Sequence, residues 1–292
     1  MSTGPSAKKD SAKKRTREKK LADSFALHLK PKQIIALVLL FLGVAGGTTA
    51  LLGFANWSSE NSRTDEQVKN AVEAAKIRET NGGAIVEQDE DPDEDNPYWA
   101  FIKMNLLNVN LKNLMLTNDE TKGWIQVAGT NVNYPFVQHD DNEYYLKHSF
   151  DKSTNSAGWV FMDYRNNANM SDKNTIFYAH GRVDTTMFGG LRHILYNGWL
   201  SDRANFVVRT SSPEKNGIWQ IFSVYHLPTT TDYLKTNFKD DNEYAEFLKM
   251  ITERSAYDFR SAPNSKDQIV TLSTCYNDRE RMVVHAKLVK FN

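Results

Sequence analysis

The chain has 292 residues, with 36 basic and 36 acidic side chains, a formal net charge of zero at pH 7 and a single cysteine. One cysteine cannot form a disulfide within the chain. The balanced total hides an uneven distribution, because residues 1–32 hold ten Lys or Arg against three acids and residues 56–96 hold twelve acids against four bases. Basic side chains gathered beside an apolar segment indicate a membrane topology signal, and they argue against a nucleic-acid-binding surface.

An apolar stretch without charged residues follows the basic tail. It covers residues 34–55, and a helix of this length spans about 33 Å, enough to cross a hydrocarbon core about 30 Å thick. We expect a transmembrane anchor at residues 33–55, with the tail at 1–32 in the cytoplasm and the rest of the chain outside the cell membrane. A cleaved signal peptide is the alternative, although the apolar core of such a peptide usually has only about 7–15 residues.

Residues 56–96 form an acidic stalk. Helix-forming residues with apolar side chains at Val68, Val72 and Ala75 predict an amphipathic helix over residues 65–79. The second half of the stalk has two adjacent glycines and an acidic run but few apolar side chains to bury. We therefore expect a flexible spacer there.

The remaining residues, 97–292, are numerous enough for one hydrophobic core and form the working domain. Short runs of β-branched and aromatic residues between turn signals predict a mostly antiparallel barrel or sandwich. The expected strands are 123–127, 134–137, 159–162, 175–179, 204–208, 219–226, 268–274 and 282–291. Helical patterns are expected near residues 99–107, 186–196 and 241–255.

The only cysteine, Cys275, ends one of these expected strands. Val270 and Leu272 are apolar, whereas Thr271, Ser273 and Cys275 are small or polar, and this period of two places the thiol on the polar face of the sheet. The five residues before Arg281 include turn formers, so an antiparallel hairpin is favoured, with Arg281 opposite Cys275. A nearby guanidinium favours the thiolate, and we interpret Cys275 as a reactive thiol; a buried, inert thiol is the alternative.

A histidine is the expected partner of this thiol. His180 follows an apolar strand and precedes a glycine, which is a usual position for a reacting side chain. His285 is the rival, because it lies four residues beyond Arg281 and therefore on the same face of the same strand. The alternative interpretation of His285 is a histidine of the barrel wall, and spacing alone leaves both candidates open.

Five segments of the domain carry a recognisable pattern: NYPFVQHDDNEYYLKHSF at 133–150, GWVFMDYRN at 158–166, NTIFYAHGR at 174–182, TLSTC at 271–275 and RMVVHAKL at 281–288. Together, and in family order, they resemble class B sortases, and the resemblance covers the whole of residues 97–292. The resemblance implies a mostly β fold, an eight-stranded sortase-type β-barrel with short peripheral helices. It also implies a long connection at about residues 227–267 that carries a helix and shapes the substrate groove.

The resemblance also implies an activity. Sortases are membrane-anchored cysteine transpeptidases: the thiol attacks a threonyl carbonyl in a C-terminal sorting signal, holds the upstream protein as a thioester and passes it to an amine. It implies that Cys275 is the nucleophile, that His180 is the general acid and base, and that Arg281 holds substrate carbonyls and stabilises the oxyanion. The implied partners are surface proteins with a signal of the Asn-Pro-x-Thr type, and an amine of peptidoglycan or its lipid-linked precursor, or a pilin lysine.

Matched positions of the resemblance also imply a substrate groove. Its residues are Asn142, Leu146 and Ser273, together with Tyr233 and Leu234 in the long connection and a threonine, for which Thr229 and Thr231 compete. No cluster has metal-ligand spacing, so we expect neither a metal nor a cofactor.

Two other functions remain open. An exported cysteine peptidase would hydrolyse the same type of bond, because water can replace the amine, although papain-like families usually place the cysteine before the histidine. A non-catalytic, membrane-tethered wall-binding module would use the barrel without chemistry. Thiol reactivity that depends on Arg281 and His180 would distinguish an enzyme from such a module.

Overall fold

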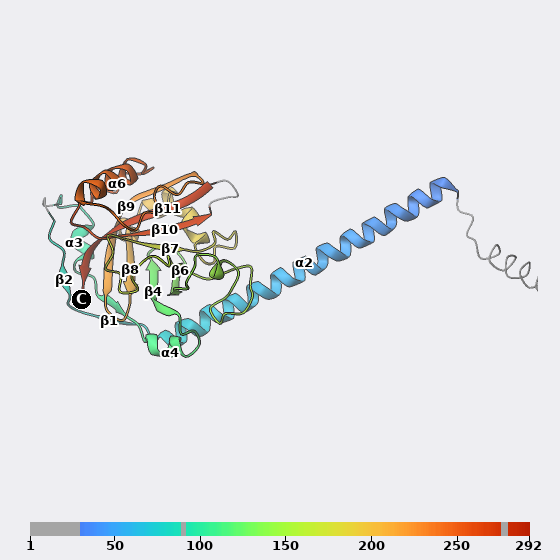
Figure 1. Ribbon diagram of the computed structural model, residues 1–292, viewed down its shortest axis with the longest axis horizontal. Helices are drawn as coiled ribbons and strands as arrows, with labels where there is room; N and C mark the ends of the chain where they lie inside the picture. The colour runs from blue at the N-terminus through green and yellow to red at the C-terminus, as the bar shows by residue number, and fades with distance from the viewer. Residues whose placement is uncertain (1–29, 89–91, 276–279) are drawn as a thin grey trace, which may run out of the picture. The chain divides into compact units, whose positions relative to one another are not determined.

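The computed structural model describes residues 30–88, 92–275 and 280–292, and it leaves the side chain of Cys275 undescribed (Figure 1). Most of the basic tail expected at residues 1–32 and the turn between Cys275 and Arg281 therefore lie outside the described residues. The chain divides into two compact units, residues 1–58 and residues 59–292.

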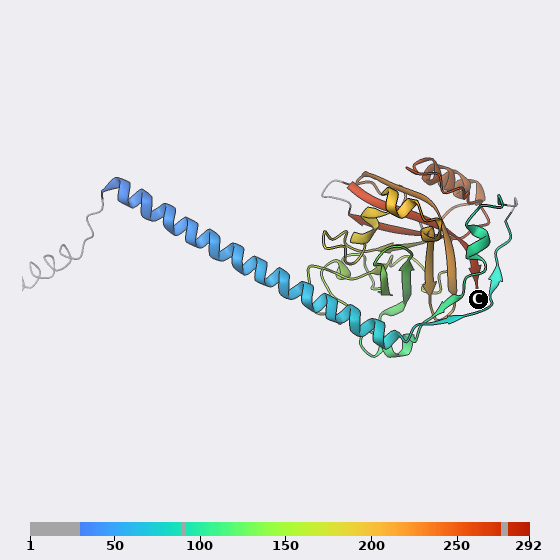
Figure 2. The same cartoon turned by 180° about the vertical axis from the view of Figure 1, so that it is seen from behind.

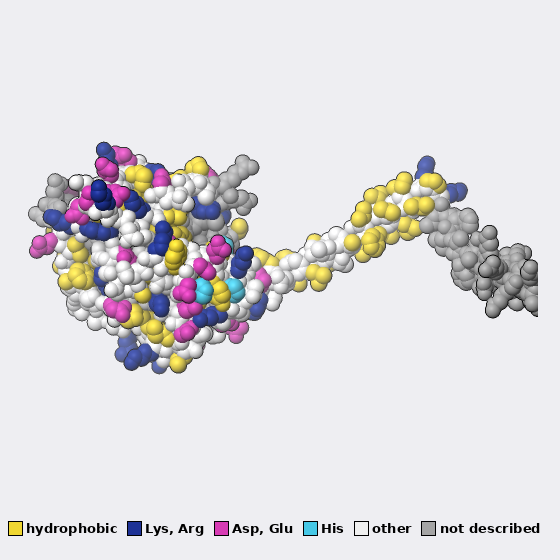
Figure 3. Space-filling model, in the orientation of Figure 1, with side chains coloured by type: hydrophobic (Ala, Val, Ile, Leu, Met, Phe, Trp, Pro, Cys, Tyr) yellow, Lys and Arg dark blue, Asp and Glu magenta, His cyan; other side chains and the backbone are white. Residues whose placement is uncertain are grey.

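The described part of the first unit is the beginning of a long helix, α2 (Pro31–Ala75). Large apolar side chains such as Leu40, Phe41 and Leu51 are exposed along it, and hydrophobic side chains are prominent on its visible surface in Figure 3. The helix is long and apolar enough to cross a membrane, by length and composition. This agrees with an anchor at residues 33–55, whereas the orientation of that anchor stays a prediction.

The second unit contains the rest of α2 and a closed sheet with short helices around it. After α2, its elements in chain order are β1 (Arg78–Thr80), β2 (Ala84–Ile85), α3 (Tyr98–Phe101), β3 (Leu106–Asn108), α4 (Leu111–Met115), β4 (Thr121–Val127), β5 (Asn133–Val137), η1 (Tyr144–Leu146), β6 (Phe161–Met162), β7 (Asn174–Tyr178), η2 (Gly189–His193), α5 (Asn197–Leu200), η3 (Arg203–Asn205), β8 (Val207–Ser211), β9 (Asn216–Pro228), α6 (Asp241–Glu253), β10 (Ile269–Cys275) and β11 (Glu280–Phe291), where η marks a 3-10 helix.

Eight of these strands close into a barrel. Their order is β10, β7, β6, β5, β4, β8, β9 and β11, and β11 pairs with β10 to complete the circle. The β10–β7 and β5–β6 pairs are parallel, and the other pairs in the barrel are antiparallel. The eight-stranded barrel with short helices that the resemblance implied is confirmed, and its closure leaves no open sheet edge among these eight strands.

The barrel has one core inside and a second on its outer face. Side chains on alternate positions of the strands, among them Ile125, Phe136 and Leu272, fill the interior. On the outside, α6 covers an apolar cluster that includes Phe222 and Tyr244 (Figure 1). The two cores together bury both faces of β10, which leaves the end of the strand as the position for polar chemistry.

The expected helices differ from the observed ones in length. The helix expected at residues 99–107 is only α3, and β3 follows it because its backbone pairs with β1. The helix expected at residues 186–196 is the shorter η2, followed by α5. The helix expected at residues 241–255 is confirmed as α6, whose first turn is capped by the Asp240 carboxylate, an acceptor for Glu243 N at 2.9 Å.

One expected strand is displaced along the chain. Residues 204–208 were predicted as a strand, but residues 203–205 form η3 and β8 begins only at Val207. The cause is local: the Asp202 carboxylate accepts a hydrogen bond from Ala204 N at 3.0 Å, which stabilises the turn that opens η3.

The end of α2 belongs to the second unit and packs against it. Thr64, Ala71 and Ala75 are buried, and Thr64 Oγ1 accepts a hydrogen bond from Asn155 Nδ2 at 3.0 Å. The helix expected over residues 65–79 therefore exists, but it ends at Ala75, where Lys76 takes a left-handed conformation with φ of 42°.

The spacer prediction is wrong for the described residues that follow. β1 pairs with β3 and β2 pairs with the end of β11, and Val86 N donates to Val289 O at 3.0 Å. Figure 2 shows β2 and the C-terminus close together at one side of the barrel. Counting apolar side chains missed these contacts, because backbone hydrogen bonds to neighbouring strands hold the segment in place. Residues 89–91 lie outside the described part, and the four-part domain division stays a prediction.

Candidate active site

Strand direction and register bring the three predicted catalytic positions to one end of the barrel. β10 and β7 run parallel, so their last residues lie at the same end, and Ser273 pairs with Tyr178. Cys275 lies two residues beyond Ser273, as His180 lies two residues beyond Tyr178. β11 runs antiparallel to β10, so its first residues lie at that end too, and Arg281 is the direct partner of Cys275. The predicted hairpin register is confirmed, whereas the catalytic roles stay predictions.

A backbone carbonyl holds the ring of His180. His180 Nε2 lies 2.8 Å from Leu146 O, and since a carbonyl only accepts, Nε2 carries the hydrogen. In the neutral ring, Nδ1 is then the nitrogen free of a proton. Gly158 lies beside this contact with φ of 62°, and a Cβ there would come within 2.5 Å of Tyr145 O and 3.0 Å of His180 Cδ2. A glycine is therefore needed where η1 approaches His180.

His285, the rival histidine, is a structural residue. It is fully buried, with Nδ1 at 2.9 Å from Thr271 Oγ1 and Nε2 at 2.8 Å from Tyr225 Oη. Burial, with a smaller contribution from the charge of Arg254, lowers the pKa of His285 to about 3. The ring is thus neutral at physiological pH and both of its nitrogens have partners, so it fits the barrel-wall interpretation.

Arg281 is partly buried at the start of β11, opposite Leu227 of β9. The simplest structural role for it would be an ion pair with Asp278 or Glu280. Within the described ranges no carboxylate pairs with Arg281; Glu280 Oε1 lies 3.5 Å from His226 Nδ1, and Asp278 is outside those ranges. An ion pair with Glu280 is therefore not seen, and the role of Arg281 stays a prediction.

The predicted groove residues lie on three segments around this end of the barrel. Ser273 Oγ and Tyr233 Oη are 2.9 Å apart and buried, so β10 and the long connection meet two residues before Cys275. Leu234 is partly buried, whereas Thr229 and Thr231 are exposed. The structure does not choose between the two threonines.

Asn142 and Leu146 belong to the segment around η1. The Asn142 side chain donates from Nδ2 to Asp163 Oδ2 at 3.0 Å and accepts from Tyr164 N at 3.1 Å. The Leu146 side chain packs against the interior core, and its carbonyl is the acceptor that holds His180. Both residues thus organise the loop, in addition to the substrate contacts that the resemblance implies.

Sequence reasoning missed a buried carboxylate at the end of β6. The Asp163 side chain is fully buried and pairs with Arg165 at 2.7 Å. Burial tends to raise the pKa of Asp163, but hydrogen bonds from Arg165 and Tyr178 outweigh it and hold that pKa below its ordinary value. The signal was present in the segment GWVFMDYRN, where an acid directly follows an apolar strand and an arginine lies two residues later.

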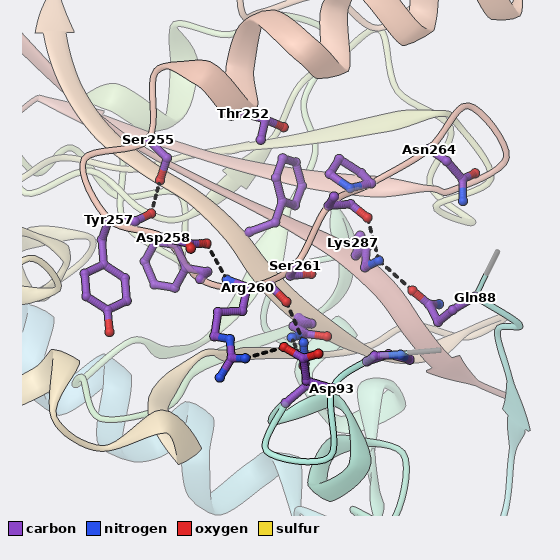
Figure 4. Close-up of a pocket in the computed structure, with 17 residues that line it drawn as sticks. Gln88, Asp93, Thr252, Ser255, Tyr257, Asp258, Arg260, Ser261, Asn264 and Lys287 are labelled. Atoms are coloured by element: carbon purple, nitrogen blue, oxygen red, sulfur yellow. Dashed lines mark hydrogen bonds and ion pairs between the residues drawn. The ribbon is translucent and has the colours of Figure 1, made fainter. Parts of the chain in front are cut away.

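A cavity of about 900 Å³ lies elsewhere, beside the start of β10 (Figure 4). Lys287, the partner of Ile269 at the far end of β10 from Cys275, lines it. Its Nζ donates to Gln88 Oε1 at 2.5 Å and to Ala262 O at 2.8 Å, and Arg260 pairs with Asp93 across the same hollow. These contacts tie the described parts of the acidic stalk to the loop before β10.

Comparison with known proteins agrees with this geometry. Residues 125–289, more than half of the chain, match the sortase domain family. Sortase B of Listeria monocytogenes is 34% identical over 183 residues, which are 61% of this chain and 74% of that protein. Sortase B of Staphylococcus aureus is 33% identical over 177 residues, 59% of this chain and 72% of that protein.

Solved structures give the same result. The crystal structure of sortase B from Bacillus anthracis in complex with AAEK1 superposes with a TM-score of 0.64 at 32% identity, covering 80% of this chain and 99% of that chain. The Staphylococcus aureus sortase B–substrate complex has a TM-score of 0.57 at 33% identity, covering 61% of this chain and 84% of that chain. The chain therefore belongs to the sortase family, and within it to the class B sortases, which are cysteine transpeptidases.

Proposed function

We propose that this sortase B cleaves a C-terminal sorting signal after threonine and transfers the upstream protein to an extracellular amine. The observation that carries the proposal is the register at one end of the barrel: Cys275 opposite Arg281 on β10 and β11, with His180 just past the end of the parallel β7. A nucleophile, a proton carrier and a fixed cation at one point are what acyl transfer to an amine requires.

In the first half-reaction, the Cys275 thiolate attacks the threonyl carbonyl carbon. The C–N bond then breaks, the leaving amine takes a proton from the His180 imidazolium, and a thioester remains. The hydrogen bond from Nε2 to Leu146 O supports Nδ1 as the atom that gives this proton, because Nε2–H is already engaged. In the second half-reaction, an incoming amine attacks the thioester, Nδ1 accepts a proton, and the C–S bond breaks.

Arg281 has the electrostatic role. Negative charge develops on the carbonyl oxygen as the thiolate attacks, and a preorganised donor at that oxygen is worth about 2.7–4 kcal/mol. A guanidinium suits the task because it is always charged and presents several donors in a fixed plane. The absence of an ion-pair partner for Arg281 among the described residues supports this role.

The substrates are proposed by chemical class. The peptide is a sorting signal of the Asn-Pro-x-Thr type, held along Asn142, Leu146, Ser273, Tyr233 and Leu234, with Thr229 or Thr231 at the rim. The acceptor is the free amine of a peptidoglycan cross-bridge or its lipid-linked precursor; a pilin lysine is the alternative. A solved sortase B of 32% identity is complexed with triglycine, which supports an amino-terminal glycine as the attacking group.

The test is mass spectrometry of the full chain in detergent micelles, mixed with an Asn-Pro-x-Thr peptide, with and without triglycine. We expect a thioester adduct on Cys275 and a transfer product that needs triglycine. Cys275→Ala should abolish both, and His180→Ala and Arg281→Ala should each slow transfer by about 10²-fold or more. Arg203→Ala, which removes a guanidinium from η3, is the matched control and should leave the rate unchanged. An intact rate in Arg281→Ala would disprove its assigned role, and product that forms equally without triglycine would indicate a peptidase.

The orientation of the anchor predicts on which side of the membrane Cys275 lies. Because it is the only cysteine in the chain, labelling of its thiol tests that prediction directly. With residues 1–32 inside the cell, Cys275 lies outside the membrane. A membrane-impermeant maleimide should therefore label intact cells that express the chain, and Cys275→Ala should remove the label. Labelling only after the cells are broken would reverse the proposed orientation.

A further inference from the structure

The buried carboxylate of Asp163 is surrounded by donors from the walls of the proposed groove. Oδ1 accepts from Arg165 N at 2.9 Å and from Arg165 Nε at 2.8 Å. Oδ2 accepts from Arg165 Nη2 at 2.7 Å, from Asn142 Nδ2 at 3.0 Å and from Tyr178 Oη at 2.8 Å. A carboxylate has about four lone-pair sites, so this one is fully occupied.

The donors come from segments that are distant in sequence. Asn142 belongs to the segment that leads into η1, and Tyr178 is the last residue of β7, two residues before His180. Arg165 continues the network, because its Nη2 also donates to Leu234 O at 3.1 Å in the long connection. One carboxylate and one guanidinium therefore connect the η1 segment, the histidine strand and the connection that carries Tyr233.

We propose that Asp163 and Arg165 are positioning residues that hold the three walls of the peptide groove at a fixed separation. The inference rests on the proposed function, since it concerns the groove of that same site. Asp163 has no exposed surface, so it acts through Asn142, Tyr178 and Arg165 without touching the peptide. Arg165 is about one third exposed and lies between Asp163 and the connection.

A groove held in this way is ordered before the peptide arrives. If the network is broken, the peptide must order the walls as it binds. The free energy needed to order them then weakens peptide binding. The peptide KM should rise while kcat changes less, because neither Asp163 nor Arg165 contacts the reacting groups in the described residues. The chemical reactivity of Cys275 and the KM for the amine should stay near their wild-type values.

The experiment uses the full chain in detergent micelles and compares Asp163→Asn, Arg165→Gln and Tyr178→Phe with the wild type. Asp163→Asn keeps the shape but removes the charge, and we expect it and Arg165→Gln to raise the peptide KM about tenfold. Tyr178→Phe removes a single donor and should raise it about threefold to fivefold. Arg165→Lys keeps the charge without the planar fork of donors, so its peptide KM should lie between those of the wild type and Arg165→Gln.

The matched control is Tyr244→Phe. This tyrosine is also buried, and its hydroxyl lies 3.0 Å from the carbonyl oxygens of Lys173 and Asp267 under α6, outside the network. The loss of its hydroxyl should change thermal stability without raising the peptide KM. Alkylation of Cys275 by iodoacetamide, measured on every variant, should stay within about twofold of the wild-type rate.

The outcomes are distinguishable. Folded variants with unchanged peptide KM, or with a fall in kcat at constant KM, would overturn the positioning role. If Asp163→Asn does not fold, Arg165→Gln and Tyr178→Phe decide the question. A wild-type chain that forms no peptide adduct would instead refute the proposed function, and that result does not depend on any of these variants.

Discussion

His285 provides a stability prediction whose size follows from the structure. The folded protein keeps this ring neutral, with a pKa of about 3, whereas the unfolded chain binds a proton below the ordinary histidine pKa of 6.5. Acidification therefore favours the unfolded state, and each pH unit below 6.5 costs about 1.4 kcal/mol until the folded pKa is reached. Between pH 7 and pH 5 this one residue should lower the free energy of unfolding by about 2 kcal/mol.

The assay is urea unfolding of residues 59–292 at pH 7 and pH 5, for the wild type and for His285→Gln. The variant is less stable at pH 7, because buried hydrogen bonds to Thr271 and Tyr225 are disturbed, but it loses less stability on acidification. The difference between the two pH-dependent losses should be about 2 kcal/mol, and carboxylates contribute equally to both proteins. Equal losses would refute the reasoning that His285 is neutral in the folded state. His285→Gln should also keep its thiol reactivity, unlike His180→Ala.

Three further predictions follow from contacts around the site. Gly158→Ala should cost about 1–3 kcal/mol of stability and lower kcat, because the added methyl group displaces η1 from His180; an unchanged kcat would contradict the close approach. A fragment of residues 97–292 should melt about 5 °C or more below one of residues 59–292, because it lacks the docked end of α2 and the paired strands β1 and β2. Equal melting temperatures would show that those contacts do not stabilise the domain. Asp240→Ala should lower the melting temperature by about 2–4 °C through loss of the α6 cap, with transfer activity intact; a larger loss of activity than of stability would place α6 in the site.

The alternation of side chains along β10 was a reliable guide. Because strand side chains have a period of two, Val270 and Leu272 were expected on one face, and both lie in the interior core. The side of the Cys275 thiol stays a prediction. The short gap before β11 predicted the hairpin, which the Cys275–Arg281 register confirms. These features are local, so neighbouring residues carry the information.

The errors arose where distant contacts override local composition. The acidic stalk has little to bury, yet β2 pairs with β11 and Gln88 accepts from Lys287, about 200 residues later. Asn142 and Tyr178, the distant donors to Asp163, could not be recognised from the sequence, since they approach Asp163 only when β6 pairs with β5 and β7. Sequence patterns report the strands, but they do not report which loops meet at the strand ends.

The residues alone indicated a mostly antiparallel barrel or sandwich, an apolar N-terminal helix and a cysteine placed opposite an arginine, because periodicity and short connections act within a few residues. The resemblance chose the barrel. The family resemblance indicated His180 in preference to His285. Only the folded chain supplied physical reasons for that preference: parallel pairing of β7 with β10 puts His180 level with Cys275, and burial keeps His285 neutral. Proximity between distant segments and the exclusion of water are properties of the packed structure, so no local pattern can contain them.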